Sequence, residues 1–163
     1  MQNKYFLDVN ILIDLLVNSN YKNVRSNDDV PNLTKNKIKE ILSDRDKICV
    51  ISSTSLVTAF FALTNKNRSL MAHTAGLLLK IYSAEDSFVV ACKSLDAQIK
   101  ALEFAKENNA DFEDALQYFC AKENGCTTMI TNDKDFPKLE IPLLRTDPKL
   151  KNFTPKFKKF KTE

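Results

Sequence analysis

Short, uninterrupted apolar segments alternate along the chain with longer segments whose apolar residues recur at helical spacing. Five of the short segments predict buried strands, at residues 4–9, 47–52, 87–92, 127–131 and 143–144. Strands that are apolar on both faces are typical of a parallel sheet covered by helices on each side. The alternation therefore predicts an α/β fold, a three-layer α/β/α domain with a central parallel sheet of four to five strands.

The segments between these strands predict helices over 10–17, 34–42, 53–63, 69–81, 94–108 and 111–124. Thr34 is the expected N-cap of the second helix. On the fifth, Leu95, Ile99, Leu102 and Ala105 share one face. We expect one domain over residues 1–147 and a separate basic tail over residues 148–163.

The composition excludes several kinds of site. Two glycines are too few for a glycine-rich phosphate loop, and one histidine excludes a zinc helix with two histidines. Four cysteines without a CxxC pair predict reduced, mostly buried thiols in a cytoplasmic protein. No apolar run is long enough to span a membrane, and the N-terminus has no signal-peptide pattern.

Positive charge is concentrated at the C-terminal end. The net charge is +3, but residues 148–163 hold six lysines and one acid, so the rest of the chain is slightly acidic. Three phenylalanines interleave with these lysines. Lysines neutralise phosphates and aromatic rings stack on bases, which makes the tail a candidate for nucleic-acid contact. The alternatives are a disordered tail and one that docks through its phenylalanines.

Three aspartates are expected at one edge of the sheet. Asp8 ends the first strand, Asp133 follows the fourth, and Asp114 lies in the first turn of the helix before the fourth. Ligands of open parallel sheets bind beyond the carboxyl ends of the strands. Acids gathered there repel one another unless a cation is present. Mg²⁺ or Mn²⁺ takes carboxylate oxygens, and such a site can polarise a phosphodiester and activate a water.

Each acid also has a structural interpretation. Asp8 could cap the first helix, and Asp111 has the form of an N-cap with an acid three residues later. Asp14 is expected on the solvated face of the first helix. Asp133 and Asp135 could simply form the turn after the fourth strand.

Two parts of the chain resemble PIN-domain ribonucleases. The segment FLDVNILIDLL at residues 6–16 is similar to their opening, and DFEDALQ at 111–117 with MITNDKDF at 129–136 is similar to their closing half. The resemblance implies a PIN-like, Rossmann-like α/β/α domain with an acidic cluster that binds Mg²⁺ or Mn²⁺. Many small bacterial members are VapC-type toxins, which cut RNA and are inhibited by an antitoxin protein.

Matched to that pattern, the catalytic and metal-binding residues are Asp8, Asp114 and Asp133. Asp135 is an alternative to Asp133 or an outer acid. The family usually has a Glu or Asp on the helix after the second strand, where this chain has Thr58. A hydroxyl is a poor replacement for a carboxylate, so this departure puts activity in doubt. Glu40, Asp44 and Asp46 are near in sequence, but nothing assigns any of them to that place.

Two further polar residues, Asn10 and Thr131, are expected to hydrogen-bond a carboxylate or a metal-bound water. The lysines assigned to RNA contact are Lys156, Lys158 and Lys159.

The function expected from the resemblance is a metal-dependent endoribonuclease, the toxin of a bacterial toxin–antitoxin pair. RNA and an antitoxin are its expected partners, a homodimer is an open alternative to a monomer, and no membrane is involved. The other interpretations are a catalytically weak or inactive PIN-fold RNA-binding or interaction module, and a DNA nuclease.

Overall fold

Five parallel strands form the central sheet of the computed structural model, which describes residues 2–21, 29–65, 67–137 and 139–151. Their order across the sheet is β3-β2-β1-β4-β5. The strands are β1 (Asn3–Leu7), β2 (Lys47–Ser52), β3 (Phe88–Ala91), β4 (Thr128–Ile130) and β5 (Leu143–Leu144). The predicted parallel sheet is confirmed, and its strands lie within the predicted segments to one or two residues.

Successive residues of the strands enter two different hydrophobic cores, because side chains alternate across a sheet. Leu7 is in register with Ile51 of β2 and Ile130 of β4, and all three lie in one core. The preceding residue, Phe6, lies in the other core together with Met129. The sheet is therefore buried on both faces, which explains the continuous apolar character of its strands.

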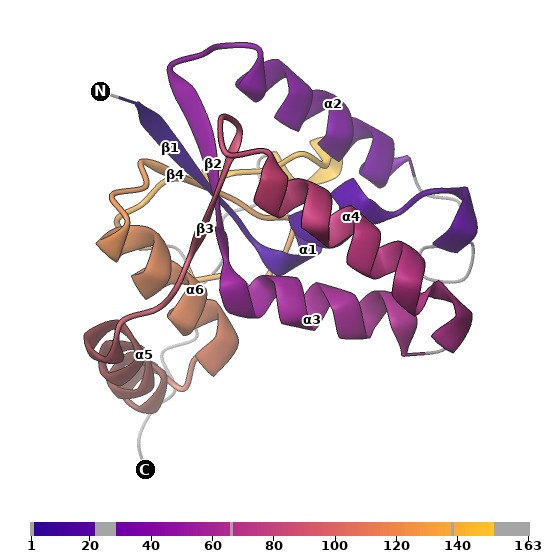
Figure 1. The fold of residues 1–163 in the computed structure, drawn as a ribbon. Helices are drawn as coiled ribbons and strands as arrows, with labels where there is room; N and C mark the ends of the chain where they lie inside the picture. The colour runs from indigo at the N-terminus through magenta and orange to yellow at the C-terminus, as the bar shows by residue number, and fades with distance from the viewer. Residues whose placement is uncertain (1, 22–28, 66, 138, 152–163) are drawn as a thin grey trace.

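Helices cover both faces of this sheet. They are α1 (Val9–Leu16), α2 (Val30–Leu42), α3 (Ser53–Thr64), α4 (Met71–Ser83), α5 (Leu95–Asn108) and α6 (Phe112–Glu123). Residues of α1 to α4 build the core on one face, and residues of α6 build the core on the other. Figure 1 shows α2 and α4 on one side of the sheet and α5 and α6 on the other. The predicted three-layer α/β/α architecture is confirmed.

The prediction for the start of the second helix was wrong. This helix begins at Val30, with Pro31 in its first turn, and Thr34 lies inside it rather than at its cap. Pro31 favours an early start because its fixed φ suits the first turn and its missing N–H is not needed there. Thr34 is fully buried, and its hydroxyl bonds other side chains.

The expectation that Asp14 faces solvent was also wrong. Asp14 is 0% exposed, and its Oδ2 accepts a hydrogen bond of 3.3 Å from the Thr34 hydroxyl. Apolar periodicity predicts that the face of α1 with Asp14 is exposed to solvent. In the structure α2 packs against this face and buries it.

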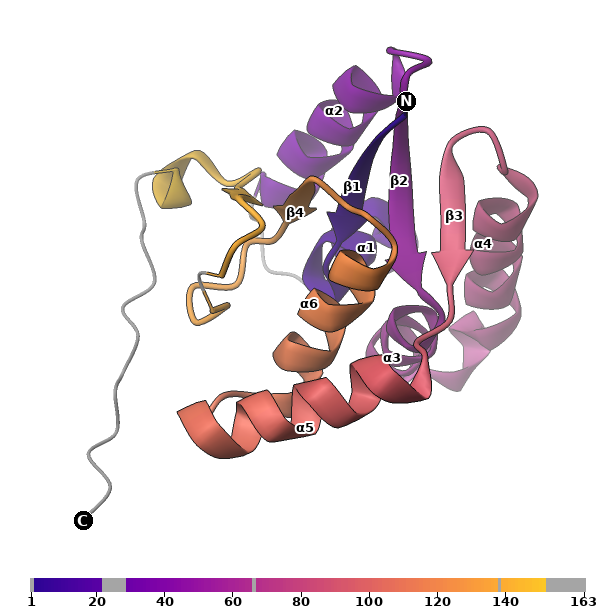
Figure 2. The same cartoon turned by 90° about the vertical axis from the view of Figure 1, so that its left-hand side faces the viewer.

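Helix α5 exposes its large apolar residues and buries small ones. Leu95, Ile99 and Leu102 are 72%, 47% and 54% exposed, whereas Ala97 and Ala101 are buried. Figure 2 shows α5 lying outside the sheet, next to α6. The face predicted from the periodicity therefore exists, but its large residues remain open to solvent because the helix packs through the alanines.

The four cysteines are free, as expected, and three of them are buried: Cys49, Cys120 and Cys126. Burial raises the pKa of the Cys49 thiol to about 12, so it stays protonated. Within the described ranges, no helix has the length and apolar content needed to cross a membrane. The fold continues to a short 3-10 turn at Pro148–Leu150, where Leu150 is buried. Lys156, Lys158 and Lys159 lie outside the described residues.

The two glycines predict opposite effects of the same substitution. Gly76 lies inside α4, with open space where a Cβ would stand, so Gly76→Ala should stabilise the protein by about 0.5–1 kcal/mol. Gly125 has φ +67° after the end of α6, and Gly125→Ala should destabilise it by roughly 1–2 kcal/mol. Urea unfolding of the two variants measures both free energies. Equal effects of the two changes would contradict this assignment.

Candidate active site

Three aspartates that are far apart in sequence lie at the carboxyl edge of the sheet. Asp8 directly follows β1, and Asp133 follows β4, its parallel neighbour. Asp114 lies in the first turn of α6. The Oε1 atom of Gln117, one turn further along α6, accepts a hydrogen bond of 3.2 Å from the Val9 backbone N–H at the start of α1. This contact joins α6 to the end of β1.

Asp8 is held in a fixed orientation by its hydrogen bonds. Its Oδ1 caps α1 by accepting from the Val9 N–H at 2.6 Å, and its Oδ2 accepts from the Asn10 amide and the Thr131 hydroxyl, each at 2.6 Å. Asp8 is only 1% exposed. Burial raises its pKa to about 6, although the hydrogen bonds from Thr131 and Val9 act to lower it. The capping interpretation of Asp8 is thus correct, and it leaves the carboxylate at the sheet edge.

The contacts expected of Asn10 and Thr131 with a carboxylate are present, since both donate to Asp8. Each also bonds the chain after β4. The Asn10 Oδ1 accepts from the Asn132 N–H at 3.2 Å, and the Thr131 Oγ1 accepts from the Asp133 N–H at 3.0 Å. These side chains connect the carboxyl ends of β1 and β4. Whether they also contact a metal-bound water stays a prediction.

Asp114 carries the most strongly perturbed carboxyl group of the site. Burial raises its pKa to about 8, and the negative charges of Asp133, Asp8, Asp111 and Glu113 raise it further, in that order. The three predicted acids are therefore close enough to feel one another's charge. Asp111 caps α6, as expected, by accepting from the N–H groups of Glu113 at 2.8 Å and Asp114 at 3.2 Å.

The acids after β4 differ in exposure. Asp133 is partly buried, and its Oδ1 accepts from the Asp135 N–H at 2.9 Å, so the turn-forming interpretation is also correct. Asp135 is exposed. Of the two, Asp133 is the one whose charge acts on Asp8 and Asp114.

Sequence reasoning missed a buried arginine behind this turn. Arg145 is 7% exposed, and its Nη1 donates to the carbonyl of Thr131 at 2.9 Å and to that of Asp133. Burial lowers the pKa of Arg145, whereas the charges of Asp133 and Asp8 raise it. Arg145 directly follows β5, and the pairing of β5 with β4 brings it to the site. No local sequence pattern therefore predicts its position.

A second missed feature is the polar support behind Asn132. The Oδ1 of Asn132 accepts from the N–H groups of Thr146 at 3.0 Å and Asp147 at 3.1 Å, and its Nδ2 donates to the Thr146 hydroxyl at 2.6 Å. The Thr146 hydroxyl lies 2.7 Å from that of Thr34, which bonds Asp14. A chain of hydrogen bonds therefore runs from the site into the interior of the domain.

Thr58 stands beside an acid from another helix. Its hydroxyl donates to the Glu113 Oε1 at 3.3 Å, and Glu113 is the neighbour of Asp114 in α6. Glu40, Asp44 and Asp46 lie at the opposite end of the sheet, around the start of β2. No local sequence pattern indicates that α6 brings a carboxylate to Thr58.

The donors at this edge suit Mg²⁺ or Mn²⁺ chemically, because they are carboxylate oxygens with an excess of negative charge. However, no three His, Cys, Asp or Glu side chains of the described residues are placed to hold one ion as they stand. Asp8 is fixed by three hydrogen bonds. Joint binding of an ion by Asp8, Asp114 and Asp133 therefore requires Asp114 or Asp133 to turn.

Comparisons with known proteins agree on one family. Residues 34–142 match the sequence profile of the PIN domain. The chain is 25% identical to the ribonuclease VapC1 of Aquifex aeolicus (strain VF5) over 148 residues, which cover 88% of this chain and 91% of that protein. Its fold is similar to the crystal structure of Mycobacterium tuberculosis VapC20, described as a toxin that cleaves the sarcin–ricin loop. The TM-score is 0.61 at 15% identity, covering 81% of this chain and 92% of that one.

The perturbed Asp114 predicts an unusual pH dependence of stability. Its folded pKa of about 8 lies above the ordinary value of 3.8. Its contribution to stability is therefore complete below pH ~4 and is lost as the pH rises towards 8. Because Asn cannot ionise, Asp114→Asn should stabilise the metal-free protein increasingly over that range. Melting temperatures in EDTA at a series of pH values measure this effect.

The matched control is Asp86→Asn, which changes an exposed carboxyl in the turn before β3. Its melting temperature should follow that of the original protein at every pH. A difference between Asp114→Asn and the original protein that stays constant from about pH 5 to 9 would show that Asp114 is not perturbed in this way.

Proposed function

This chain belongs to the PIN-domain family, and from that premise we propose that it is a metal-dependent endoribonuclease. The observation that carries the proposal is the mutual electrostatic influence of Asp8, Asp114 and Asp133 at the carboxyl edge of the sheet. Negative charges gathered at one place are unfavourable by themselves and become favourable around a cation. Mg²⁺ or Mn²⁺ bound there would polarise a phosphodiester and lower the pKa of a water.

The chain's own residues prepare the carboxylates for this role. Asn10 and Thr131 hold Asp8 by its Oδ2, and Arg145 holds the carbonyls on either side of Asn132. Groups that orient metal ligands typically contribute 10–100-fold to metal affinity. Asp133 would have to release its hydrogen bond from the Asp135 N–H to turn Oδ1 towards a cation, whereas no hydrogen bond of the Asp114 side chain is found among the described residues.

The proposed substrate is RNA, and the proposed role is that of the toxin in a toxin–antitoxin pair. The relative from Aquifex aeolicus is named a ribonuclease, and VapC20 is described as a toxin. A ribonuclease of this kind needs an inhibitor, so an antitoxin is the proposed protein partner. The free thiols suit the reducing cytoplasm. The assignment of Lys156, Lys158 and Lys159 to RNA contact stays a proposal.

A second candidate function is supported by Thr58. By the resemblance its hydroxyl stands where the family usually has an acid, and it donates a hydrogen bond to the carboxylate of Glu113. A site with one acid fewer binds a divalent cation more weakly. The chain would then be an RNA-binding module without catalysis. Calorimetric titration with Mn²⁺ separates the two functions, because the module would bind RNA but no metal.

RNA cleavage with Mn²⁺ is expected to fall on the order of 100-fold or more in Asp8→Asn and Asp114→Asn, because each loses a carboxylate needed for the ion. Gel analysis of single-stranded RNA, transfer RNA and flapped DNA, each offered to the same protein, measures this loss. The comparison of substrates also distinguishes a ribonuclease from a DNA nuclease. Asp86→Asn serves as the control and should cleave normally. Cleavage that survives both site changes would show that the assigned site is wrong.

A further inference from the structure

Lys93 is a half-buried lysine at the carboxyl edge of the sheet, and no acid of the described fold forms an ion pair with it. It follows β3 by two residues and precedes the N-cap of α5, Ser94. Its ammonium donates to the hydroxyl of Thr54, in the first turn of α3. Within the described ranges no ion pair joins Lys93 to a carboxylate, whereas Lys37, Lys47, Lys100 and Lys122 each have one.

The position of Lys93 is adjacent to the candidate active site. Thr54 lies one helical turn before Thr58, whose hydroxyl bonds Glu113. The negative charge of Glu113 acts on Lys93 as well as on Asp114. Figure 2 shows the chain passing from the end of β3 into α5 beside α3. Lys93 therefore flanks the carboxylates on the β3 side of the sheet edge.

A partly desolvated ammonium without a counter-ion is unfavourable. Burial lowers the pKa of Lys93, which shows that the surroundings disfavour its charge. A hydroxyl group satisfies one of its three N–H donors but supplies no negative charge. An anion that arrived at this place would supply that charge. Because Thr54 already restrains the side chain, the anion would bind with less loss of conformational entropy.

The opposite flank of the carboxylates also carries a lysine. Lys134 directly follows Asp133 and is exposed, and no hydrogen bond or ion pair of its side chain is found in the described fold. In the strand order β3-β2-β1-β4-β5, the ends of β3 and β4 lie on opposite sides of β1, which carries Asp8. Three strand spacings separate them, about 14 Å at ~4.8 Å each, a length that a few nucleotides span.

We propose that Lys93 and Lys134 bind backbone phosphates of the RNA on either side of the scissile bond, so that the strand crosses the sheet edge from β3 to β4. This inference rests on the proposed function and specifies how its substrate lies. It assigns phosphate contacts to the folded domain itself, in addition to any made by the basic tail. The carboxylates then face the phosphate that lies between the two lysines.

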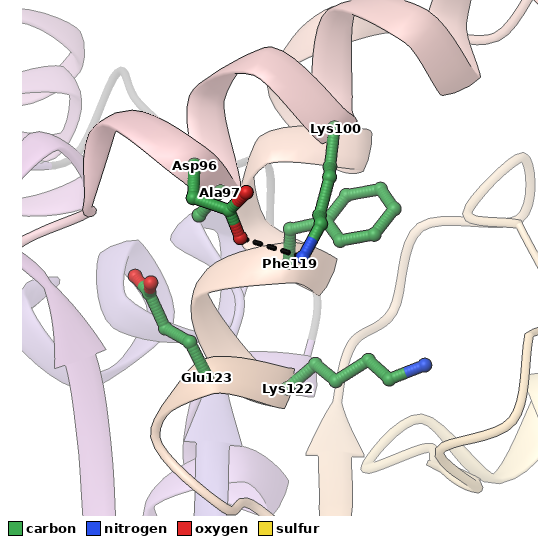
Figure 3. A pocket seen from close by; sticks show the side chains of 6 residues that line it. All are labelled: Asp96, Ala97, Lys100, Phe119, Lys122 and Glu123. Carbon is green, nitrogen blue, oxygen red and sulfur yellow. Dashed lines mark ion pairs between the residues drawn. The ribbon is translucent and has the colours of Figure 1, made fainter.

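Two other lysines of the domain, Lys100 and Lys122, do not fit this role. Lys100 and Lys122 line a pocket of about 290 Å³ between α5 and α6. Lys100 pairs with Asp96 at 2.6 Å, and Lys122 pairs with Glu140 at 2.7 Å. Figure 3 shows the Lys100 ammonium directed at Asp96 and that of Lys122 pointing away from the pocket. Because acids already neutralise both, Lys100→Met is the matched control for Lys93→Met.

The test is the salt dependence of RNA binding by the full-length protein in EDTA, where the proposed metal is removed and the RNA stays intact. Fluorescence anisotropy with a labelled single-stranded RNA gives the affinity between about 50 and 200 mM salt. Each phosphate contact to a single strand contributes about 0.7 to the slope of log affinity against log salt. Lys93→Met should reduce the slope by about 0.7, and the double change with Lys134→Met by about 1.4.

Two further variants separate phosphate binding from a structural role. Lys93→Arg keeps the positive charge and should keep the slope, and Lys100→Met should leave it unchanged. An unchanged slope in Lys93→Met overturns the proposal, as does equal weakening by Lys93→Arg and Lys93→Met. The absence of RNA binding by the original protein overturns it too.

Cleavage assays on the same variants tell this failure apart from failure of the proposed function. If the original protein cleaves RNA and Lys93→Met leaves the slope unchanged, the nuclease proposal stands and only the proposal of phosphate contacts is rejected. If the original protein does not cleave RNA and Lys93→Met reduces the slope, the phosphate contacts are supported and the function is that of the RNA-binding module.

Discussion

The carboxylate of Asp8 is the point at which the two central strands of the sheet are joined at their functional ends. One oxygen caps α1, and the other accepts hydrogen bonds from Asn10 on α1 and Thr131 after β4, each at 2.6 Å. A buried carboxylate is stable only where several donors surround it. These donors fix the ends of β1 and β4 relative to each other, and the positions of Asp133 and Asn132 follow from that.

Donor and acceptor chemistry gives direction to the polar chain behind the site. The Thr34 hydroxyl donates its single hydrogen to Asp14, so the Thr146 hydroxyl must donate to Thr34 and accept from Asn132. Each of these two hydroxyls therefore donates towards Asp14 and accepts from the side of Asn132. Three successive hydrogen bonds, through Thr34 and Thr146, thus connect the buried carboxylate of Asp14 to Asn132, which precedes Asp133 in the turn after β4.

Positive charge is divided between the inside and the rim of the site. Arg145 is buried, and its donors are directed at backbone carbonyls of the β4 turn, so it stabilises the turn and moderates the negative field of Asp8 and Asp133. Lys93 is half-buried at the rim beside α3, and no ion pair joins it to an acid within the part of the chain that the structure describes. A permanent interior cation and an uncompensated rim cation serve different purposes, because only the second is accessible to a substrate anion.

The sequence by itself determined the layers, the parallel strands and the three aspartates at one edge, because apolar periodicity and parallel connections depend on neighbours in the chain. It also made caps at Asp8 and Asp111 structural alternatives, because their hydrogen-bond partners lie within three residues. Only the tertiary structure decided that Asp14 is buried and bonded to Thr34, that Thr58 contacts Glu113, and that Arg145 donates to the carbonyl of Asp133. Each of these depends on which helix or strand covers another, and partners that are 12 to 55 residues apart leave no local pattern.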